Sequence, residues 1–196
     1  MNDDFKVTPW EVTGEIDYDQ LITRFGTKKM DQELLDRLAG YGELHPMLRR
    51  GVVYSHRDFD CLLDQYDKGN RFFLYTGRGP SGGTHLGHLM PWMFNRYLQR
   101  LFKVKMYFQL TDDEKFLFNE NLSLEDTRRV AYENVLDFIA LGFEPEDTKV
   151  IIDTKDIGLL YPLALEVSKR VTFSTAKAVF GFENSYNIGQ IFYTSI

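Results

Sequence analysis

The central stretch of the chain, residues 72–115, alternates between the apolar patterns of strands and of a helix. Phe72 to Tyr75 is a short apolar run that ends in the turn-forming sequence from Thr76 to Gly83. Apolar residues then recur at every third or fourth position from Leu86 to Leu101, as on a helix with one buried face. Residues 104–110 alternate apolar and polar side chains. This pattern predicts a strand, a glycine-rich turn that begins at Thr76, a helix, and a second strand followed by an acidic loop.

A strand, a crossover helix and a second strand of these lengths predict a right-handed βαβ unit with parallel strands. In such sheets, ligands bind beyond the carboxyl ends of the strands. Both of those ends carry polar residues here, at residues 75–83 and 109–115. The turn offers backbone N–H groups, and the helix after it adds the positive end of its dipole. We therefore expect a phosphate-binding site at this edge of the sheet.

The segments on either side extend the α/β pattern. A third strand is predicted at residues 149–152, after a helix capped by Ser123. A further helix is predicted to begin at Tyr161-Pro162, because proline fits the first turn of a helix. Before the central stretch, residues 52–54 predict a short strand, and Ser55 is predicted to cap the next helix. This order of elements predicts a parallel sheet with flanking helices.

Composition narrows the possible classes of protein. A chain of 196 residues with 43% hydrophobic and 27% charged residues is typical of one globular domain with an extension. The net charge of -6 argues against a broad basic surface that binds nucleic acid whatever its sequence. No run approaches the roughly 18 apolar residues of a membrane span, and the acidic start is unlike a targeting peptide. We expect a soluble, cytoplasmic protein with no DNA partner and no membrane contact.

The single cysteine, Cys61, leaves no intramolecular disulfide and fits a reducing compartment. We expect Cys61 to be a small, half-buried helix residue rather than a catalytic thiol. The sequence contains neither paired Cys-x-x-Cys motifs nor a His-Glu-x-x-His motif, so no protein metal site is predicted.

Two interpretations of the glycine-rich turn follow from the residues alone. Gly77 to Gly82 matches the G-x-G-x-x-G dinucleotide pattern, but the acidic residue expected about 20 residues later would fall near Tyr97, inside the helix. A dehydrogenase is therefore disfavoured. In the second interpretation, His85 and His88 lie on one helical face and Gly87 between them lets a flat ligand approach closely. The two histidines are equally compatible with capping or with surface positions.

In combination, these motifs resemble eukaryotic-type tryptophanyl-tRNA synthetases, which are class I aminoacyl-tRNA synthetases. The resemblance rests on three segments: Tyr75-Thr76-Gly77-Arg78-Gly79-Pro80-Ser81, His85-Leu86-Gly87-His88, and Gln109-Leu110-Thr111-Asp112-Asp113-Glu114-Lys115. The histidine tetrad is similar to the first ATP-binding motif of that class. The resemblance implies a Rossmann-like catalytic domain whose first part is residues 71–196, with residues 1–70 as an N-terminal extension packed on it. It also implies that the second ATP motif and the anticodon-binding domain are absent from this chain.

The resemblance implies a function as well. The family activates L-tryptophan with ATP and Mg²⁺ to tryptophanyl-adenylate, and transfers the amino acid to tRNA(Trp) as a cytoplasmic homodimer. Carried over residue by residue, it places Gly77, Arg78, Gly79, His85, Gly87 and His88 at ATP, with His85, His88 and Arg78 as catalytic residues. It places Tyr75 and Gln109 at the indole N–H of tryptophan, and Glu114 at the ammonium group.

Several alternatives stay open at this stage. The chain is also compatible with a tyrosine-specific relative of the same architecture, or with a ligand-binding fragment that performs no reaction. Arg78 is compatible with an exposed arginine in a turn, and Asp112 to Glu114 with a solvated acidic turn. The segment from Ser81 to His85 departs from the family, with Gly82-Gly83-Thr84 in place of a more polar stretch.

Overall fold

The computed structural model describes residues 6–7, 12–13, 18–183 and 185–196. The chain divides into two compact units, residues 1–72 and residues 73–196. Each unit is described by itself.

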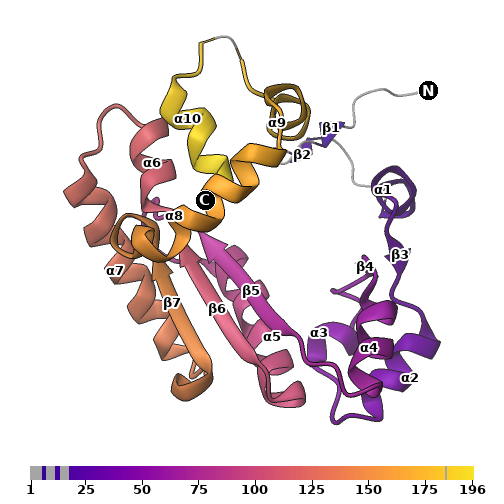
Figure 1. Cartoon of the computed structure of the whole chain (residues 1–196). Helices are drawn as coiled ribbons and strands as arrows, with labels where there is room; N and C mark the ends of the chain where they lie inside the picture. Colours follow the sequence, from indigo (N-terminus) through magenta and orange to yellow (C-terminus); the bar gives the residue numbers. More distant parts are fainter. Residues whose placement is uncertain (1–5, 8–11, 14–17, 184) are drawn as a thin grey trace. The chain divides into compact units, whose positions relative to one another are not determined.

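The first unit is built from short elements (Figure 1). Its strands form two antiparallel pairs, β1 with β2 and β3 with β4. The elements are β1 (Lys6–Val7), β2 (Val12–Thr13), α1 (Tyr18–Phe25), β3 (Lys28–Lys29), α2 (Gln32–Ala39), α3 (Pro46–Arg49), β4 (Ser55–His56) and α4 (Phe59–Asp67).

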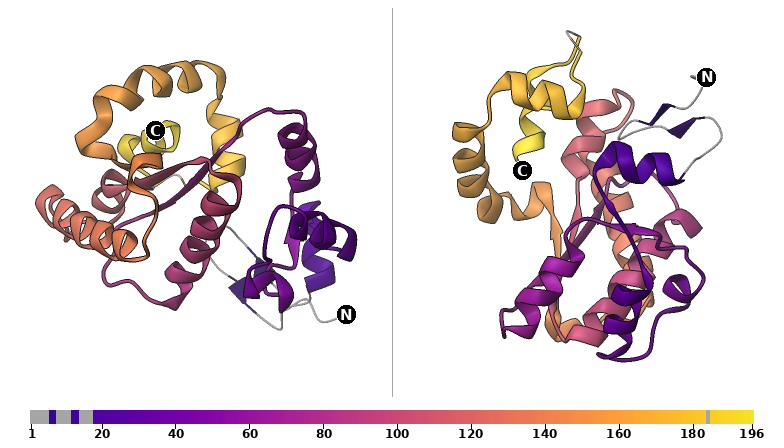
Figure 2. Two further views of the ribbon diagram at one scale, coloured as in Figure 1. Left: turned by 90° about the horizontal axis from the view of Figure 1, so that it is seen from below. Right: turned by 90° about the vertical axis from the view of Figure 1, so that its right-hand side faces the viewer.

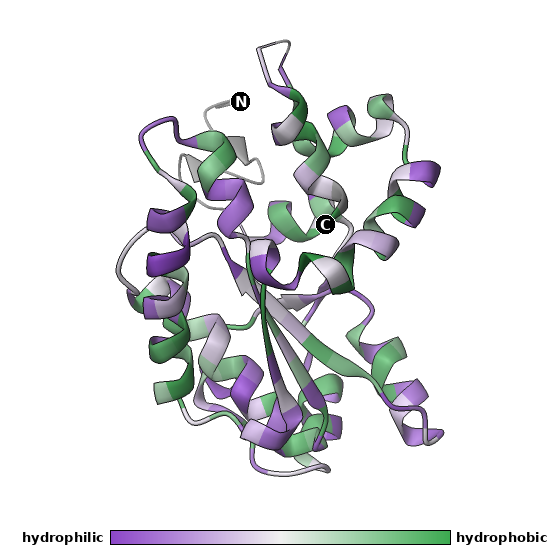
Figure 3. Cartoon of the chain, turned by 60° about the vertical axis from the view of Figure 1, so that its left-hand side comes forward, coloured by the Kyte–Doolittle hydropathy of each residue, from purple (hydrophilic) through white to green (hydrophobic). Residues whose placement is uncertain are grey.

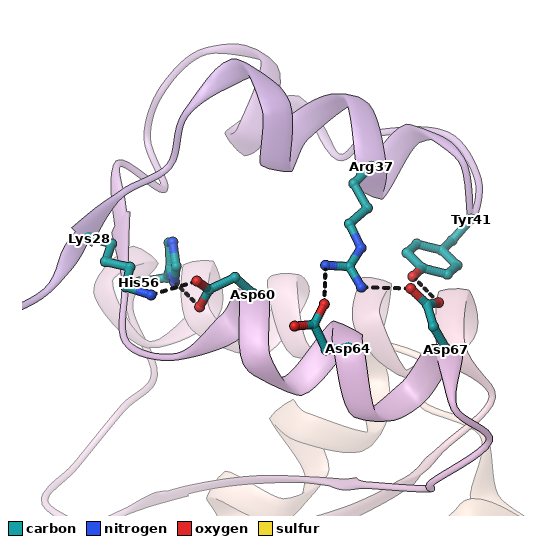
Figure 4. Close-up of polar contacts among 7 residues, drawn as sticks. All are labelled: Lys28, Arg37, Tyr41, His56, Asp60, Asp64 and Asp67. Atoms are coloured by element: carbon teal, nitrogen blue, oxygen red, sulfur yellow. Dashed lines mark hydrogen bonds and ion pairs between the residues drawn. The ribbon is translucent and has the colours of Figure 1, made fainter.

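Helices α2 and α4 are joined by a forked ion pair. The Arg37 guanidinium donates to Asp64 at 2.8 Å and to Asp67 at 2.6 Å, and the Tyr41 hydroxyl also donates to Asp67 (Figure 4). Lys28 Nζ lies 2.5 Å from Asp60 Oδ2, which ties β3 to α4. Beneath these polar contacts the unit buries leucines on three helices: Leu34, Leu38, Leu48 and Leu63.

Three expectations for this unit are wrong. The strand is Ser55–His56 rather than residues 52–54, because Lys29 and Ser55 pair across the antiparallel ladder. The N-cap of α4 is therefore Asp58, in the left-handed conformation with φ 55°, rather than Ser55. Cys61 is exposed on α4 instead of half-buried, because Leu63 faces the core on that helix.

The second unit holds a parallel sheet with strand order β5-β6-β7, which confirms the predicted parallel α/β fold (Figure 1). Along its helices, apolar and polar segments alternate, as expected for elements that bury one face (Figure 3). The elements are β5 (Phe73–Arg78), α5 (Leu86–Phe102), β6 (Lys105–Leu110), α6 (Asp112–Phe118), α7 (Leu124–Ala140), η1 (Pro145–Asp147), β7 (Thr148–Ile152), α8 (Asp153–Arg170), α9 (Phe173–Phe180), α10 (Ile188–Phe192) and η2 (Tyr193–Ser195).

Strand β5 runs further than its apolar residues predict. The turn expected at Thr76 is wrong, because Gly77 and Arg78 continue the ladder opposite Gln109 and Leu110 of β6. A Cβ on Gly77 would lie 2.7 Å from the backbone oxygen of Gln109. Only glycine fits so close an approach of two strands, so this glycine belongs to the strand rather than to a turn.

The core of the second unit is an aromatic stack on one face of the sheet. Phe108 of β6 stacks on Phe138 of α7 with ring centroids 3.8 Å apart, and Trp92 of α5 meets both rings edge-on. All three side chains are fully buried. Helices α5 and α7 therefore pack on the same face of the sheet, and Figure 2 shows α8 and α9 on its other side.

Helix α8 begins at Asp153, so the start predicted at Tyr161-Pro162 is wrong. The reason is that its capping partner comes from another element. Asp112 Oδ1 accepts a hydrogen bond from the Thr154 backbone N–H at 3.0 Å. Pro162 lies inside the helix.

The acidic loop expected after β6 is also wrong, because Asp112, Asp113 and Glu114 form the first turn of α6. No described helix has both the length and the apolar composition that crossing a membrane requires.

Candidate functional site

Three polar side chains converge where the parallel strands end. Side chains alternate between the two faces of a strand, and Phe108 points into the aromatic core, so Gln109 points to the opposite face. The ladder places Gly77 beside Gln109 and Gln109 beside Ile151. Tyr75 and Asp153 stand two positions from those partners, so both share the face of Gln109. The sheet thus brings together side chains from all three strand ends.

These residues form one chain of hydrogen bonds. The Tyr75 hydroxyl donates to Gln109 Oε1 at 2.5 Å, and Gln109 Nε2 donates to Asp153 Oδ1 at 2.8 Å. Gln109 is 7% exposed and Asp153 is 2% exposed, whereas the Tyr75 ring is largely open to solvent. Burial of its hydroxyl raises the pKa of Tyr75, so it stays protonated at neutral pH. The arrangement places the Tyr75 hydroxyl and the Gln109 amide oxygen side by side, next to an exposed tyrosine ring.

The carboxyl groups of Asp112 and Asp153 are both buried at this edge of the sheet. Asp112 is fully buried, so the interpretation of this residue as part of a solvated acidic turn is wrong. Desolvation raises the pKa of both Asp113 and Asp153. The charge of Asp113 raises the pKa of Asp153 further, whereas the charge of Asp112 raises that of Asp113. A pKa of about 8 favours the protonated form of Asp153 at neutral pH. Sequence reasoning missed Asp153, although it stands directly after the third predicted strand, where a functional residue of a parallel sheet is expected.

Arg78 is buried beneath the loop that follows β5, so its interpretation as an exposed turn arginine is wrong. Its guanidinium donates to Thr84 Oγ1 at 2.8 Å and to the carbonyl oxygens of Gly82 and Gly83 at 2.9 and 3.0 Å. Asn134 of α7, 1% exposed, donates to the same Gly82 oxygen at 3.1 Å. The glycine-rich loop is held from below by these two side chains.

The histidine pair caps helix α5. His85 is the N-cap residue, and its Nδ1 accepts from the Gly87 backbone N–H at 3.2 Å. His88 Nδ1 accepts from the His85 backbone N–H at 3.4 Å, and the two rings lie 3.8 Å apart. Burial and nearby Arg78 lower the pKa of His88. Both imidazoles use Nδ1 in the cap, which leaves Nε2 as the atom for a ligand.

The two polar edges predicted from the sequence meet at Gly79. A Cβ on Gly79 would lie 2.3 Å from Lys115 Cε and 3.2 Å from Glu114 Oε2, so the ends of these two α6 side chains lie directly against the turn. Glu114 Oε2 accepts from Thr111 Oγ1 at 2.7 Å, and Lys115 Nζ lies 3.4 Å from Glu114 Oε1. The carboxylate predicted to bind an ammonium group therefore lies beside the loop predicted to bind ATP.

Comparison with known proteins agrees with this fold. Residues 67–192 match the family model described as tRNA synthetases class I (W and Y). The parallel sheet and the residues at its carboxyl edge thus belong to a class I aminoacyl-tRNA synthetase. Specifically, the chain is a member of the tryptophanyl and tyrosyl family of that class.

Several similar proteins are named as tryptophan enzymes. The tryptophan–tRNA ligase of Sulfolobus acidocaldarius is 53% identical over 198 residues, which cover 100% of this chain and 52% of that protein. The solved tryptophanyl-tRNA synthetase of Plasmodium falciparum superposes with a TM-score of 0.88 at 44% identity, covering 92% of this chain and 51% of the other. That of Encephalitozoon cuniculi, bound to tryptophan, gives 0.87 at 41%, with the same 92% and 51%. The chain spans about half the length of the curated relatives that it matches.

Proposed function

We propose that the protein to which this chain belongs is a tryptophan–tRNA ligase. It joins L-tryptophan to ATP as tryptophanyl-adenylate and then transfers the amino acid to tRNA(Trp) for translation in the cytoplasm. The observation that carries the proposal is the hydrogen-bonded pair of Tyr75 and Gln109 at the strand ends. Relatives named tryptophan–tRNA ligase, about half identical over the whole chain, support it.

The amino-acid site recognises the indole ring by its single polar atom. An indole N–H is a donor only and needs an acceptor when it is buried. Gln109 Oε1 and the Tyr75 hydroxyl oxygen supply that acceptor at the end of the sheet. Glu114 takes the ammonium group as a charge-assisted partner. A site that binds a polar atom rejects analogues that lack it far better than an apolar pocket does.

The ATP site is assigned to the glycine-rich loop and the start of α5. A carboxylate oxygen of tryptophan attacks the α-phosphorus of ATP in line, and pyrophosphate leaves with the electrons of the broken bond. Such a reaction needs positioning and charge stabilisation more than proton transfer. His85 and His88 contact the phosphates, with the backbone of Gly77 and Gly79, and Gly87 lies under the adenosine.

The role of Arg78 follows from its contacts. Its guanidinium is already bonded to the loop carbonyls, so its contribution to ATP binding includes holding the loop in shape. Mg²⁺ enters with the ATP phosphates, as is usual for this ion, and no side chain of this chain is assigned to it.

We also propose that the protein is a homodimer that contacts its partner partly through residues 171–182. Exposed apolar side chains gather there, among them Val171, Phe173 and Val179. They line an apolar cavity of about 500 Å³ between α8, α9 and α10, separate from the predicted site residues.

The proposed reaction is tested by tryptophan-dependent exchange of pyrophosphate into ATP, with tyrosine as the control amino acid. Exchange with tryptophan alone supports the function and places adenylate formation within this chain. Exchange with tyrosine alone would establish the tyrosine-specific relative instead. Tryptophan binding without exchange would mean that this chain acts as a ligand-binding fragment, and that the reaction needs the remainder of the protein.

A further inference from the structure

The amide of Gln109 can recognise an indole N–H in only one of its two orientations. Its oxygen accepts and its NH₂ group donates, and the two have nearly the same shape. If the NH₂ group faced the pocket, two donors would meet and the site would repel the ring nitrogen of tryptophan. Another group must therefore hold the amide with its oxygen toward the pocket.

Asp153 is placed to do this. Its Oδ1 lies 2.8 Å from Gln109 Nε2, on the side of the amide away from Tyr75. Both residues are almost fully buried, so water does not offer an alternative partner to either group. An unpaired amide N–H in such a place lowers the equilibrium population of that orientation on the order of tenfold to hundredfold. The acceptor on Asp153 thus determines which end of the Gln109 amide faces the pocket.

We infer that Asp153 is the positioning residue that holds the Gln109 amide oxygen toward the amino-acid pocket, and that it thereby sets the preference of the site for a ring with an N–H donor. This inference rests on the proposed function, because it concerns the same pocket. Asp153 does not touch the amino acid and acts through Gln109.

The proton on the carboxyl pair does not abolish this role. Burial, followed by the charge of Asp113, raises the pKa of Asp153, which favours its protonated form. Gln109 Nε2 donates to Asp153 Oδ1, so a proton on this carboxyl belongs on Oδ2 and leaves Oδ1 as the acceptor for the amide. Gln109 therefore has the same acceptor whether the pair carries the proton or not.

The carboxyl group is also held in place by its own backbone. Asp153 is the first residue of α8, and both neighbours are anchored. The Ile152 N–H donates to Asp156 Oδ2 at 2.9 Å, and the Thr154 N–H donates to Asp112. Gln109 sits in the ladder with Ile151, two residues before Asp153. Both partners of the hydrogen bond are therefore fixed by regular structure rather than by a loop.

The test compares two ligands that differ in one atom. Calorimetry measures the affinity of the 196-residue chain for tryptophan and for 3-benzothienylalanine, in which sulfur replaces the indole N–H. The ratio of the two affinities is measured for the native chain and for Asp153→Ala, Asp153→Leu and Asp153→Asn. Leucine fills the volume of the aspartate without an acceptor, in case alanine leaves a cavity that unfolds the chain.

We expect the native chain to prefer tryptophan, and Asp153→Ala and Asp153→Leu to lose about tenfold of that preference, as for a lost buried hydrogen bond. Asp153→Asn should keep it, because asparagine donates its NH₂ group to Asp113 and still offers Oδ1 to Gln109. Binding of ATP, measured on the same samples, should not change.

An unchanged ratio in Asp153→Leu, with both ligands weakened equally, would overturn the inference and leave Asp153 a purely structural residue. A native chain that binds tryptophan but does not prefer it over the sulfur analogue would also overturn it, without touching the proposed reaction. A native chain that binds no tryptophan would count against the proposed function, and the inference would fall with it.

Discussion

Asp112, at the start of α6, caps helix α8 through the Thr154 backbone N–H, to which its Oδ1 lies at 3.0 Å. Its Oδ2 accepts from the Thr154 hydroxyl at 2.5 Å, and Arg128 Nε approaches to 3.9 Å. The carboxylate is fully buried. One side chain therefore joins the ends of β6 and β7, and it fixes the start of the helix that carries Asp153.

Asp112→Ala should destabilise the fold, because it removes the cap of the part-buried Thr154 N–H and the acceptor of the Thr154 hydroxyl. We expect a loss of about 2 kcal/mol in the free energy of unfolding, measured by urea denaturation. Asp112→Asn is the matched control, since its oxygen still caps Thr154 and its size is unchanged. Equal losses in the two variants would show that the charge, rather than the cap, stabilises this end of the sheet.

Gln109→Ala should weaken tryptophan binding roughly tenfold or more, because the indole N–H loses its buried acceptor. ATP binding should change little, since Gln109 is proposed to contact the amino acid and not ATP. Calorimetry with each ligand separately measures both affinities. Equal losses for tryptophan and ATP would contradict the assignment of Gln109 to the indole ring.

Asn134→Ala should weaken ATP binding without affecting tryptophan, because its amide holds the Gly82 oxygen of the predicted ATP loop. We expect a severalfold rise in the dissociation constant of ATP, as for one hydrogen bond of about 1 kcal/mol. Asn134→Asp is the paired variant, because it keeps the volume but has no N–H to donate. If the Asn134→Asp variant binds ATP as tightly as the native chain does, the contact with Gly82 has no part in nucleotide binding.

Stability should fall as the pH rises through the titration of Asp153. Burial, followed by the charge of Asp113, raises the pKa of Asp153 from 3.8 to about 8 in the folded chain. Between those values the folded chain binds more protons than the unfolded one, so the free energy of unfolding decreases with pH. The contribution of Asp153 to the free energy of unfolding is complete below its pKa in the unfolded chain, and it is lost as the pH rises through its pKa in the folded chain.

Chemical denaturation at a series of pH values between about 4 and about 8 measures this slope. Asp153→Asn, which cannot titrate, should show a shallower decline than the native chain. Asp113, whose pKa is also raised, keeps some of the slope in that variant. A native chain with the same slope as Asp153→Asn would show that Asp153 is ionised in the folded state.

The three strands of the second unit and most of its helices could be predicted from the sequence, because each of them carries its own apolar period; α6, expected as a loop, is an exception. The helix from Leu86 and the strand at residues 105–110 are examples. What failed depends on contacts between distant residues. Gly77 looks like part of a turn until β6 lies against it, and α8 has no capping signal at its true start because Asp112 supplies the cap.

The candidate site shows the same division. Tyr75, Gln109 and Glu114 were predicted from motifs, and the structure brings Tyr75 and Gln109 into a hydrogen bond. Their roles in tryptophan binding stay predictions. Asp153 was missed because a lone aspartate after a strand carries no motif of its own. Its importance emerges only when the ladder places it two residues beyond the partner of Gln109.

The central claim is that this chain holds a pocket specific for tryptophan. The most direct measurement is calorimetric titration of the 196-residue chain with L-tryptophan, and with L-tyrosine under the same conditions. The account predicts saturable, one-to-one binding of tryptophan and at least tenfold weaker binding of tyrosine, the order expected when a buried polar group is mismatched. Equal binding of the two amino acids, or tighter binding of tyrosine, would contradict it.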